Sequence, residues 1–127
     1  MRRFAVSATL AALVLAALSL TALAASGRGP APAPARMQVV AREFSFALSR
    51  THVKAGGAVV ELANFGTDPH DLRLQRIGAR HVAGLGQVVP GQRANLGLKL
   101  RPGRYLLWCS IANHRALGMR ATLVVTR

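Results

Sequence analysis

The chain has 127 residues, the length of one domain, and its 17 Lys and Arg against 4 Asp and Glu give a formal net charge of +13. Hydrophobic residues make up 51% of the sequence, which excludes an intrinsically disordered chain. The single cysteine excludes an internal disulfide framework and a zinc site built only from cysteines. No glycine-rich phosphate loop occurs in the sequence, which argues against a nucleotide-dependent enzyme.

The N-terminus has the three-part plan of a secretory signal peptide. A short basic start precedes an uncharged stretch rich in Ala, Leu and Val over residues 4–20, and Ala22-Leu23-Ala24 then supplies a cleavage site before Ala25. Residues 1–24 are therefore predicted to be a signal peptide. A permanent N-terminal membrane anchor is the alternative, because the apolar stretch is nearly long enough to span a bilayer. Both interpretations place the rest of the chain outside the cytoplasm, in the periplasm or cell envelope.

Residues 25–36 are rich in alternating Ala and Pro and predict a stiff, extended linker without a core of its own. The folded domain is then residues 37–127, which carry 13 Lys and Arg against 4 acids and a formal charge of +9. This charge predicts attraction to acidic, transient protein partners or to an anionic membrane surface, with an Arg-biased composition as the alternative explanation. The basic residues are scattered along the domain, so nucleic acid is not expected as a partner.

Short strands separated by turn residues account for most of the domain, and no stretch has a convincing helical period with caps. The clearest pattern lies in residues 92–100, where alternate residues are apolar. Pro90-Gly91 and Pro102-Gly103 mark turns on either side of it. Further strands are expected at residues 37–46, 51–54, 58–64, 70–74, 103–109 and 119–126, whereas residues 77–87 are too ambiguous to assign.

Seven to eight short strands with regular turn signals predict an all-β fold, a Greek-key β-sandwich or barrel. Tyr105 stands at the start of a strand, just after the turn at Pro102-Gly103. This placement resembles the tyrosine corner of Greek-key folds and supports the same prediction.

The segment from Trp108 to Met119 collects three residues that bind soft metals. Cys109, His114 and Met119 follow one another with the spacing C-x4-H-x4-M. A thiolate, an imidazole and a thioether suit copper rather than magnesium, calcium or manganese, and zinc would gain little from the methionine. A buried inert cysteine and a core methionine are the alternatives. A bound metal explains the cysteine better, because a single cysteine in an exported protein is exposed to oxidation.

His70 is the candidate for a further ligand, because it opens a strand directly after a turn. In a sandwich, a loop beside an early strand can lie next to a loop at the end of a late one. His70, Cys109 and His114 would then form a trigonal set with Met119 as a weak axial ligand, which is the ligand set of a blue-copper electron-transfer site. The remaining histidines, His52 and His81, have no other ligand residue nearby in the sequence and are expected to face solvent.

The domain resembles the small cupredoxins, the plastocyanin and azurin family. The resemblance rests on REFSF at residues 42–46, VKAGGAVVELANFGTDPHDLRL at 53–74 and RPGRYLLWCSIANHRALGMRATLVV at 101–125. The spacing of the ligand loop is more similar to that of rusticyanin and sulfocyanin than to that of plastocyanin. The resemblance implies a Greek-key β-sandwich, one type 1 copper ion, and electron transfer rather than enzymatic turnover. By this resemblance, the residues that match the family's copper ligands are His70, Cys109, His114 and Met119.

Some positions depart from the family's pattern. Asp71 stands where Asn is frequent and where the side chain commonly ties the two ligand loops together, although the backbone N–H of Asp71 can still reach the thiolate. Asn113 and Ala121 replace frequent glycines without removing a ligand. Trp108 should point away from the sulfur of Cys109. Packing is its ordinary role, and an electron entry point is the alternative.

The expected function is the transfer of single electrons between redox partners outside the cytoplasm. An apolar patch for transient docking is expected around His114, formed by Ile111, Ala112, Ala116 and Leu117. A copper carrier that delivers the metal to an envelope enzyme is the alternative. An accessory subunit of a copper oxidase is a third interpretation, but the chain is too short to hold the additional histidine pairs of the oxidase itself.

Overall fold

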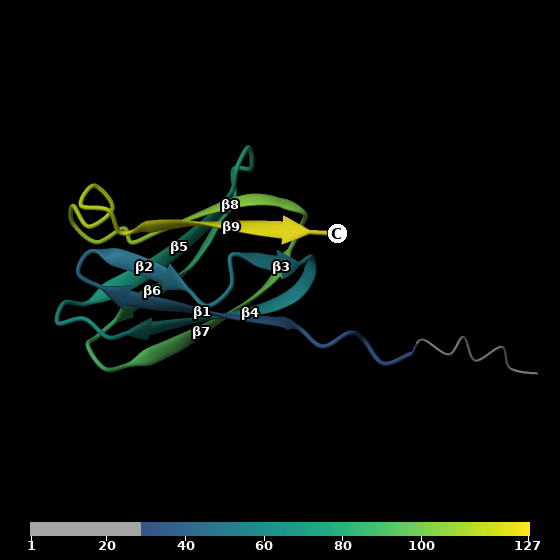
Figure 1. Ribbon diagram of the computed structural model, residues 1–127, viewed down its shortest axis with the longest axis horizontal. Coiled ribbons are helices and arrows are strands. Elements are labelled where there is room, and N and C mark those ends of the chain that lie inside the picture. The colour runs from purple at the N-terminus through teal and green to yellow at the C-terminus, as the bar shows by residue number, and fades with distance from the viewer. Residues whose placement is uncertain (1–28) are drawn as a thin grey trace, which may run out of the picture. The chain divides into compact units, whose positions relative to one another are not determined.

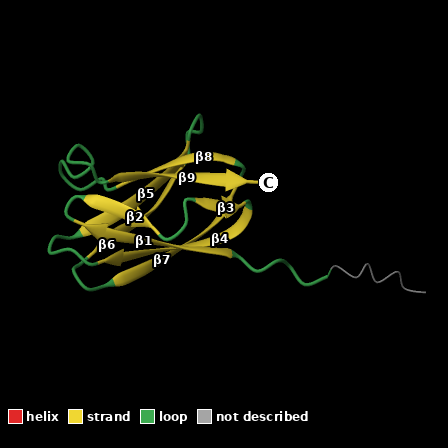
Figure 2. Ribbon diagram, viewed as in Figure 1, coloured by secondary structure: helices red, strands yellow, loops and turns green. Residues whose placement is uncertain are grey.

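The computed structural model describes residues 29–127, so the predicted signal peptide lies outside the described residues. Two β-sheets form this part of the chain (Figures 1 and 2). The strands are β1 (Ala35–Arg42), β2 (Ser45–Leu48), β3 (His52–Lys54), β4 (Gly56–Asn64), β5 (His70–Arg76), β6 (Val82–Val88), β7 (Arg93–Leu100), β8 (Gly103–Trp108) and β9 (Arg120–Thr126). None of the described residues belongs to a helix that could cross a membrane.

The topology is that of a β-sandwich with Greek-key connections. One sheet has the order β2-β1-β4-β7 and the other has the order β3-β9-β8-β5-β6. After the β5–β6 hairpin the chain crosses to the other sheet as β7, and β8 then returns to lie beside β5. That return is the Greek-key connection. The prediction of an all-β sandwich is confirmed.

Two local predictions differ from the structure, in which residues 29–127 form nine strands rather than seven or eight. The single strand expected over residues 37–46 is wrong, because the chain turns at Glu43 and Phe44 and forms the β1–β2 hairpin. No Gly, Pro or Asn marks this turn, so the sequence carried no signal for it. The unassigned segment contains β6, which pairs with β5 despite its glycines.

Aliphatic side chains of both sheets fill the space between them. Leu62 in one sheet and Leu72, Leu107 and Leu123 in the other are fully buried. The predicted alternation of residues 92–100 is confirmed, because their apolar members turn inward while the residues between them are exposed. The core belongs entirely to the compact unit Pro32–Arg127. This part of the chain is therefore expected to fold on its own.

Tyr105 forms the predicted corner. Its hydroxyl donates to the carbonyl oxygen of Arg101 at 3.0 Å and accepts from the Arg101 N–H at 2.9 Å. Because Tyr105 is 6% exposed, these two bonds satisfy a hydroxyl that is almost excluded from water. The contact fixes the turn between β7 and β8.

Four connections lie at the opposite end of the sandwich: the β1–β2 turn, the β4–β5 connection, the β6–β7 turn and the loop between β8 and β9. Glu43 of the turn accepts hydrogen bonds from the backbone of Thr67 and Asp68 in the β4–β5 connection. Phe44 of the same turn packs on His114 of the β8–β9 loop. We call this end the ligand end, and it lies on the left in Figure 1.

Candidate metal centre

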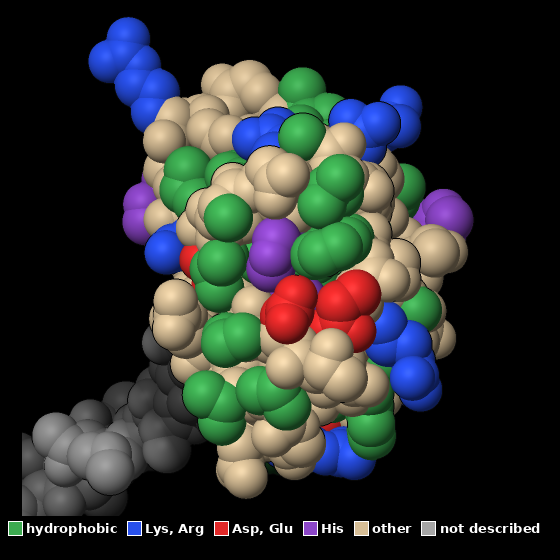
Figure 3. All heavy atoms as spheres, turned by 90° about the vertical axis from the view of Figure 1, so that its left-hand side faces the viewer, with side chains coloured by type: hydrophobic (Ala, Val, Ile, Leu, Met, Phe, Trp, Pro, Cys, Tyr) green, Lys and Arg blue, Asp and Glu red, His purple; other side chains and the backbone are tan. Residues whose placement is uncertain are grey.

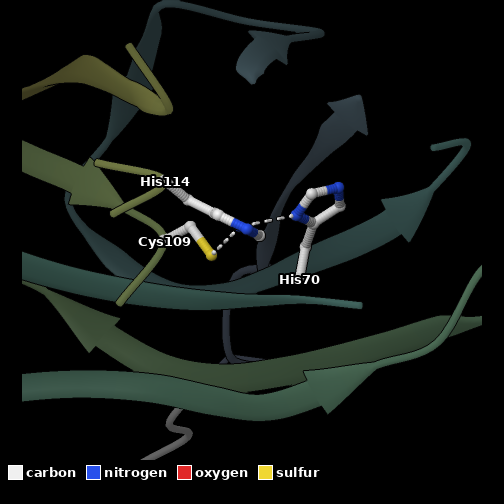
Figure 4. A group of neighbouring side chains, drawn as sticks. All are labelled: His70, Cys109 and His114. Atoms are coloured by element: carbon white, nitrogen blue, oxygen red, sulfur yellow. Dashed lines mark hydrogen bonds between the residues drawn. The ribbon is translucent and has the colours of Figure 1, made fainter. Parts of the chain in front are cut away.

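Three of the predicted ligands converge at the ligand end. The donor atoms of His70, Cys109 and His114 all lie within 4.8 Å of one another, and all three residues are buried (Figure 4). His114 Nδ1 lies 3.3 Å from His70 Nδ1 and 3.6 Å from Cys109 Sγ. Residues separated by 44 positions in the chain are therefore brought into one pocket of donor atoms. His70 comes from the start of β5, whereas the other two come from the end of β8 and the following loop.

A carboxylate fixes the orientation of the His70 ring. Glu43 Oε1 lies 3.0 Å from His70 Nε2. The backbone N–H of Asp68, together with His70 and the N–H of Thr67, lowers the pKa of Glu43 from 4.5 to about 2. An ionised carboxylate can only accept a hydrogen bond, so Nε2 carries the proton. In the neutral ring, Nδ1 is then left with a lone pair that faces Cys109 and His114.

The β4–β5 connection is shaped to receive that carboxylate. A Cβ on Gly66 would collide with Glu43 Oε1, so a residue with a side chain at this position would push Glu43 away. Asn64, which is 1% exposed, holds the connection from the inside. Its amide donates to the carbonyl oxygens of Asp68 and Val88, and its Oδ1 accepts from the N–H of Gly66. Glu43, Asn64 and Gly66 are positioning residues that the sequence did not reveal.

The loop between β8 and β9 is closed by its own backbone. The N–H of Met119 donates to the carbonyl oxygen of His114, and the N–H of Cys109 donates to the carbonyl oxygen of Met119. Gly118 has φ +116°, a conformation that a side chain would strain, directly before Met119. Met119 is fully buried and is tied by hydrogen bonds to both other predicted ligands of the loop. Its role as the axial ligand remains a prediction.

The Cys109 side chain is fully buried, and the backbone N–H groups of Asp71 and Ile111 face its sulfur. Burial raises the pKa of the Cys109 thiol, and the N–H of Asp71 opposes this rise from 3.5 Å. The expectation that this N–H reaches the sulfur is confirmed. A metal that binds here must displace the thiol proton, because the thiolate is the ligand.

The side chain of Asp71 ties the two ligand loops together. Asp71 Oδ1 accepts from the N–H of Ser110 at 2.6 Å, and Oδ2 accepts from the Ser110 hydroxyl. Arg73 also contacts Oδ2, at 3.3 Å. Although Asp71 stands where Asn is frequent, it therefore preserves the bridge between the loop of His70 and the loop of Cys109.

His52 and His81, the two histidines outside the cluster, are exposed as expected. Trp108 is half-buried, and the guanidinium of Arg115 lies over its ring at 4.6 Å. This contact is a cation–π interaction and gives Trp108 a packing role. Phe44 lies against the His114 ring with centroids 4.7 Å apart, which supports the orientation of that ligand.

The donor set fits copper. Two imidazoles and one thiolate form the His2Cys arrangement that trigonal copper sites use, and no carboxylate oxygen enters the cluster. Hard cations such as Mg2+ and Ca2+ need oxygen ligands, which this pocket does not offer. The cluster therefore fits one type 1 copper ion.

The fold is that of the cupredoxins. Auracyanin from the photosynthetic bacterium Roseiflexus castenholzii superposes with a TM-score of 0.62 at 16% sequence identity, covering 76% of this chain and all of the other. Auracyanin B gives a TM-score of 0.62 at 18% identity over 76% and 92% of the two chains. A reduced amicyanin variant gives 0.56 at 20% identity over 76% and 87%.

One similar structure belongs to an enzyme. A multicopper oxidase matches with a TM-score of 0.53 at 19% identity, and the match covers 71% of this chain but 41% of the oxidase. No family model matches the sequence, and no curated protein matches it. The likeness to these structures therefore establishes the cupredoxin fold, and the function must be argued from the site.

Proposed function

We propose that this protein carries single electrons between redox partners outside the cytoplasm, using one type 1 copper ion held by His70, Cys109, His114 and Met119. The observation that carries the proposal is the convergence of two imidazole nitrogens and one thiol sulfur in a buried cluster. The cupredoxin fold of auracyanin and amicyanin supports it. When bound, the copper ion would supply the one-electron Cu(II)/Cu(I) couple.

The protein's own contribution is a site that is already assembled. The Glu43 carboxylate fixes the His70 ring, Asp71 ties the two ligand loops together, and the backbone of Met119 closes the loop between β8 and β9. Buried ligands with fixed partners have little freedom to rearrange, so a change in metal charge would not require large side-chain motion. Such rigidity suits electron transfer better than release of the metal.

The surface at the ligand end suits brief encounters with another protein. Figure 3 shows this end, where hydrophobic side chains surround a histidine and acidic side chains lie beside it. His114 is 8% exposed, so its ring reaches close to the surface, and Leu117 of the predicted patch is 51% exposed. Phe65 and Val89 add two more exposed apolar side chains at this end. We propose that a partner docks here and exchanges electrons through His114.

Basic side chains near this docking face would attract acidic partners. Arg42 and Arg93 both lie over the Phe65 ring, and Arg115 lies on the ligand loop. The attraction should weaken as salt screens it. The rate of electron transfer to an acidic acceptor, measured by stopped flow, is therefore expected to fall as ionic strength rises. A rate that does not change with salt concentration would contradict this part of the proposal.

The test is a visible absorption spectrum of residues 25–127 titrated with Cu(II), with Cys109→Ala as the matched control. An intense thiolate-to-copper band that is lost in the control is the expected result. A reversible redox titration of the loaded protein would then support electron transfer. Copper that exchanges readily without reversible cycling would favour metal delivery instead. Absence of the band at one equivalent of copper would overturn the proposal while leaving the fold intact.

A further inference from the structure

The charges of the domain are distributed unequally between its two ends. The end remote from the metal cluster, which we call the basic end, is formed by the last residues of β3, β5, β7 and β9 and the first residues of β4 and β8. Its basic residues are Lys54, Arg76, Arg80, Lys99, Arg101, Arg104 and Arg127. Of the four acids in the sequence, Glu43, Asp68 and Asp71 lie at the ligand end, and Glu61 lies within β4, paired with Arg93. No acid neutralises the basic end.

Part of the basic end is hollowed into a cavity of about 450 Å3. It opens between β6 of one sheet and β7 of the other. Its basic rim consists of Arg76, Lys99 and Arg101, with His81 beside them, and its floor is formed by Leu74, Ala83, Leu98 and Tyr105. No acidic side chain lines the cavity. A positive rim over an apolar floor suits an anionic group attached to an apolar body.

Aliphatic side chains project next to this cavity. Ile77 in the β5–β6 connection is 54% exposed, and Val82 at the start of β6 is 41% exposed. The N–H of Ile77 donates to the carbonyl oxygen of Arg104, which holds the connection against the start of β8. Basic side chains together with exposed aliphatic ones are the combination by which peripheral proteins bind a bilayer surface: the charges meet lipid phosphates and the aliphatic groups enter the headgroup boundary.

The path of the chain also favours a membrane as the partner of the basic end. β1 begins at Ala35, which pairs with Ala58 near the start of β4, so the chain enters the domain at the basic end. The sequence before it is the Ala/Pro-rich linker, which spans about 3.1 Å per residue when extended, and before that an apolar stretch. In the alternative in which the apolar stretch is a permanent anchor, the linker joins the domain at its basic end, which favours this end facing the membrane.

We propose that the basic end docks on an anionic membrane surface, with lipid phosphate groups at the cavity rim, so that the ligand end faces away from the membrane. The proposal does not depend on the bound copper, because no predicted ligand belongs to the basic end. It extends the proposed function by giving the carrier an orientation in which His114 stays available to a partner.

The test compares vesicle binding of two triple variants of residues 25–127 that lose the same charge. Lys99→Gln, Arg101→Gln and Arg104→Gln alter the basic end. The matched control, Arg50→Gln, Arg115→Gln and Arg120→Gln, alters exposed bases elsewhere. Binding is measured by sedimentation with phosphatidylcholine vesicles containing about one-third phosphatidylglycerol. Each base near an anionic surface contributes roughly a factor of five, so the first variant should bind about 100-fold more weakly and the control less than about fivefold more weakly.

Several results would overturn the proposal. Equal losses in both variants would mean that overall charge, not this end, drives binding. Equal binding to vesicles without phosphatidylglycerol would exclude recognition of anionic lipid. Tight binding to polyglutamate without vesicle binding would assign the basic end to an acidic protein. Circular dichroism of both variants checks that the fold is retained.

Fluorescence then tests the orientation independently of affinity. Trp108, the only tryptophan, lies near the ligand end, so brominated lipids should not quench it. An Ile77→Trp variant in a Trp108→Phe background should shift its emission to the blue on the same vesicles and should be quenched. Quenching of Trp108 with no change at position 77 would reverse the proposed orientation and overturn the proposal.

Discussion

Replacement of Asp71 tests whether the bridge between the two ligand loops stabilises the site. Asp71 is 3% exposed, and its two oxygens accept from the N–H and the hydroxyl of Ser110. Asp71→Ala removes both acceptors. A hydrogen bond to a charged group contributes about 1.5–3 kcal/mol, but Ser110 is exposed and its freed groups can bind water. We therefore expect a loss of about 2 kcal/mol in the free energy of unfolding, below the roughly 3 kcal/mol that two such bonds would contribute at the low end, because water replaces part of what is lost.

The matched variant is Asp71→Asn, which keeps the shape of the side chain. Its Oδ1 can still accept from the N–H of Ser110, and its amide can donate to the Ser110 oxygen. Its main loss is the charge that faces Arg73, whose side chain is 40% exposed, and exposed ion pairs contribute about 0–1 kcal/mol. We therefore expect Asn to restore most of the stability that Ala loses.

Urea unfolding of the metal-free proteins, followed by circular dichroism, measures both variants. For a domain of this size, a loss of about 2 kcal/mol corresponds to a fall of about 10 °C in the melting temperature. An Ala variant as stable as the wild-type protein would refute the structural role of the bridge. An Asn variant as unstable as the Ala variant would show that the charge, rather than the hydrogen bonds, carries the effect.

Three further substitutions test other contacts. Glu43→Gln removes a negative charge hydrogen-bonded to His70, so the reduction potential of the loaded protein should rise in a redox titration, and a fall would contradict the geometry. Tyr105→Phe deletes both hydrogen bonds to Arg101 and should lower the free energy of unfolding by about 1–2 kcal/mol in a urea titration. An unchanged free energy of unfolding would show that these two bonds do not stabilise the turn between β7 and β8. Met119→Leu nearly conserves volume and should retain the fold. Its loss of a thioether donor should raise the potential, and an unchanged potential and spectrum would remove Met119 from the ligand set.

Much of the centre could be predicted because its donors are local in sequence. Cys109 and His114 lie on one loop, and the intervals between ligands are set by the hydrogen bonds that close it. His70 required an assumption that an early loop lies beside a late one, and the sandwich topology satisfies it. The alternation of β7 was readable because its inward and outward faces differ in polarity.

The residues that orient the donors could not be predicted in the same way. Glu43 lies 27 positions from His70, and in the sequence it is an ordinary charged residue within an expected strand. Its role depends on a turn without turn residues and on Gly66, which leaves space for the carboxylate. Neither condition is visible until β1 and the β4–β5 connection are placed together.

Asp71 shows why a departure from a family pattern need not remove a contact. An amide accepts at one atom and donates at the other, whereas a carboxylate accepts at both. The sequence cannot show which pattern is required, because the hydroxyl of Ser110 can rotate either to accept or to donate. The structure has Ser110 donating from both its N–H and its hydroxyl, and this arrangement requires the two acceptors of a carboxylate. The charge is an added consequence. Asp71 places an anion on the residue next to the ligand His70, where an amide would place none, and so would favour the more positive state of a bound metal.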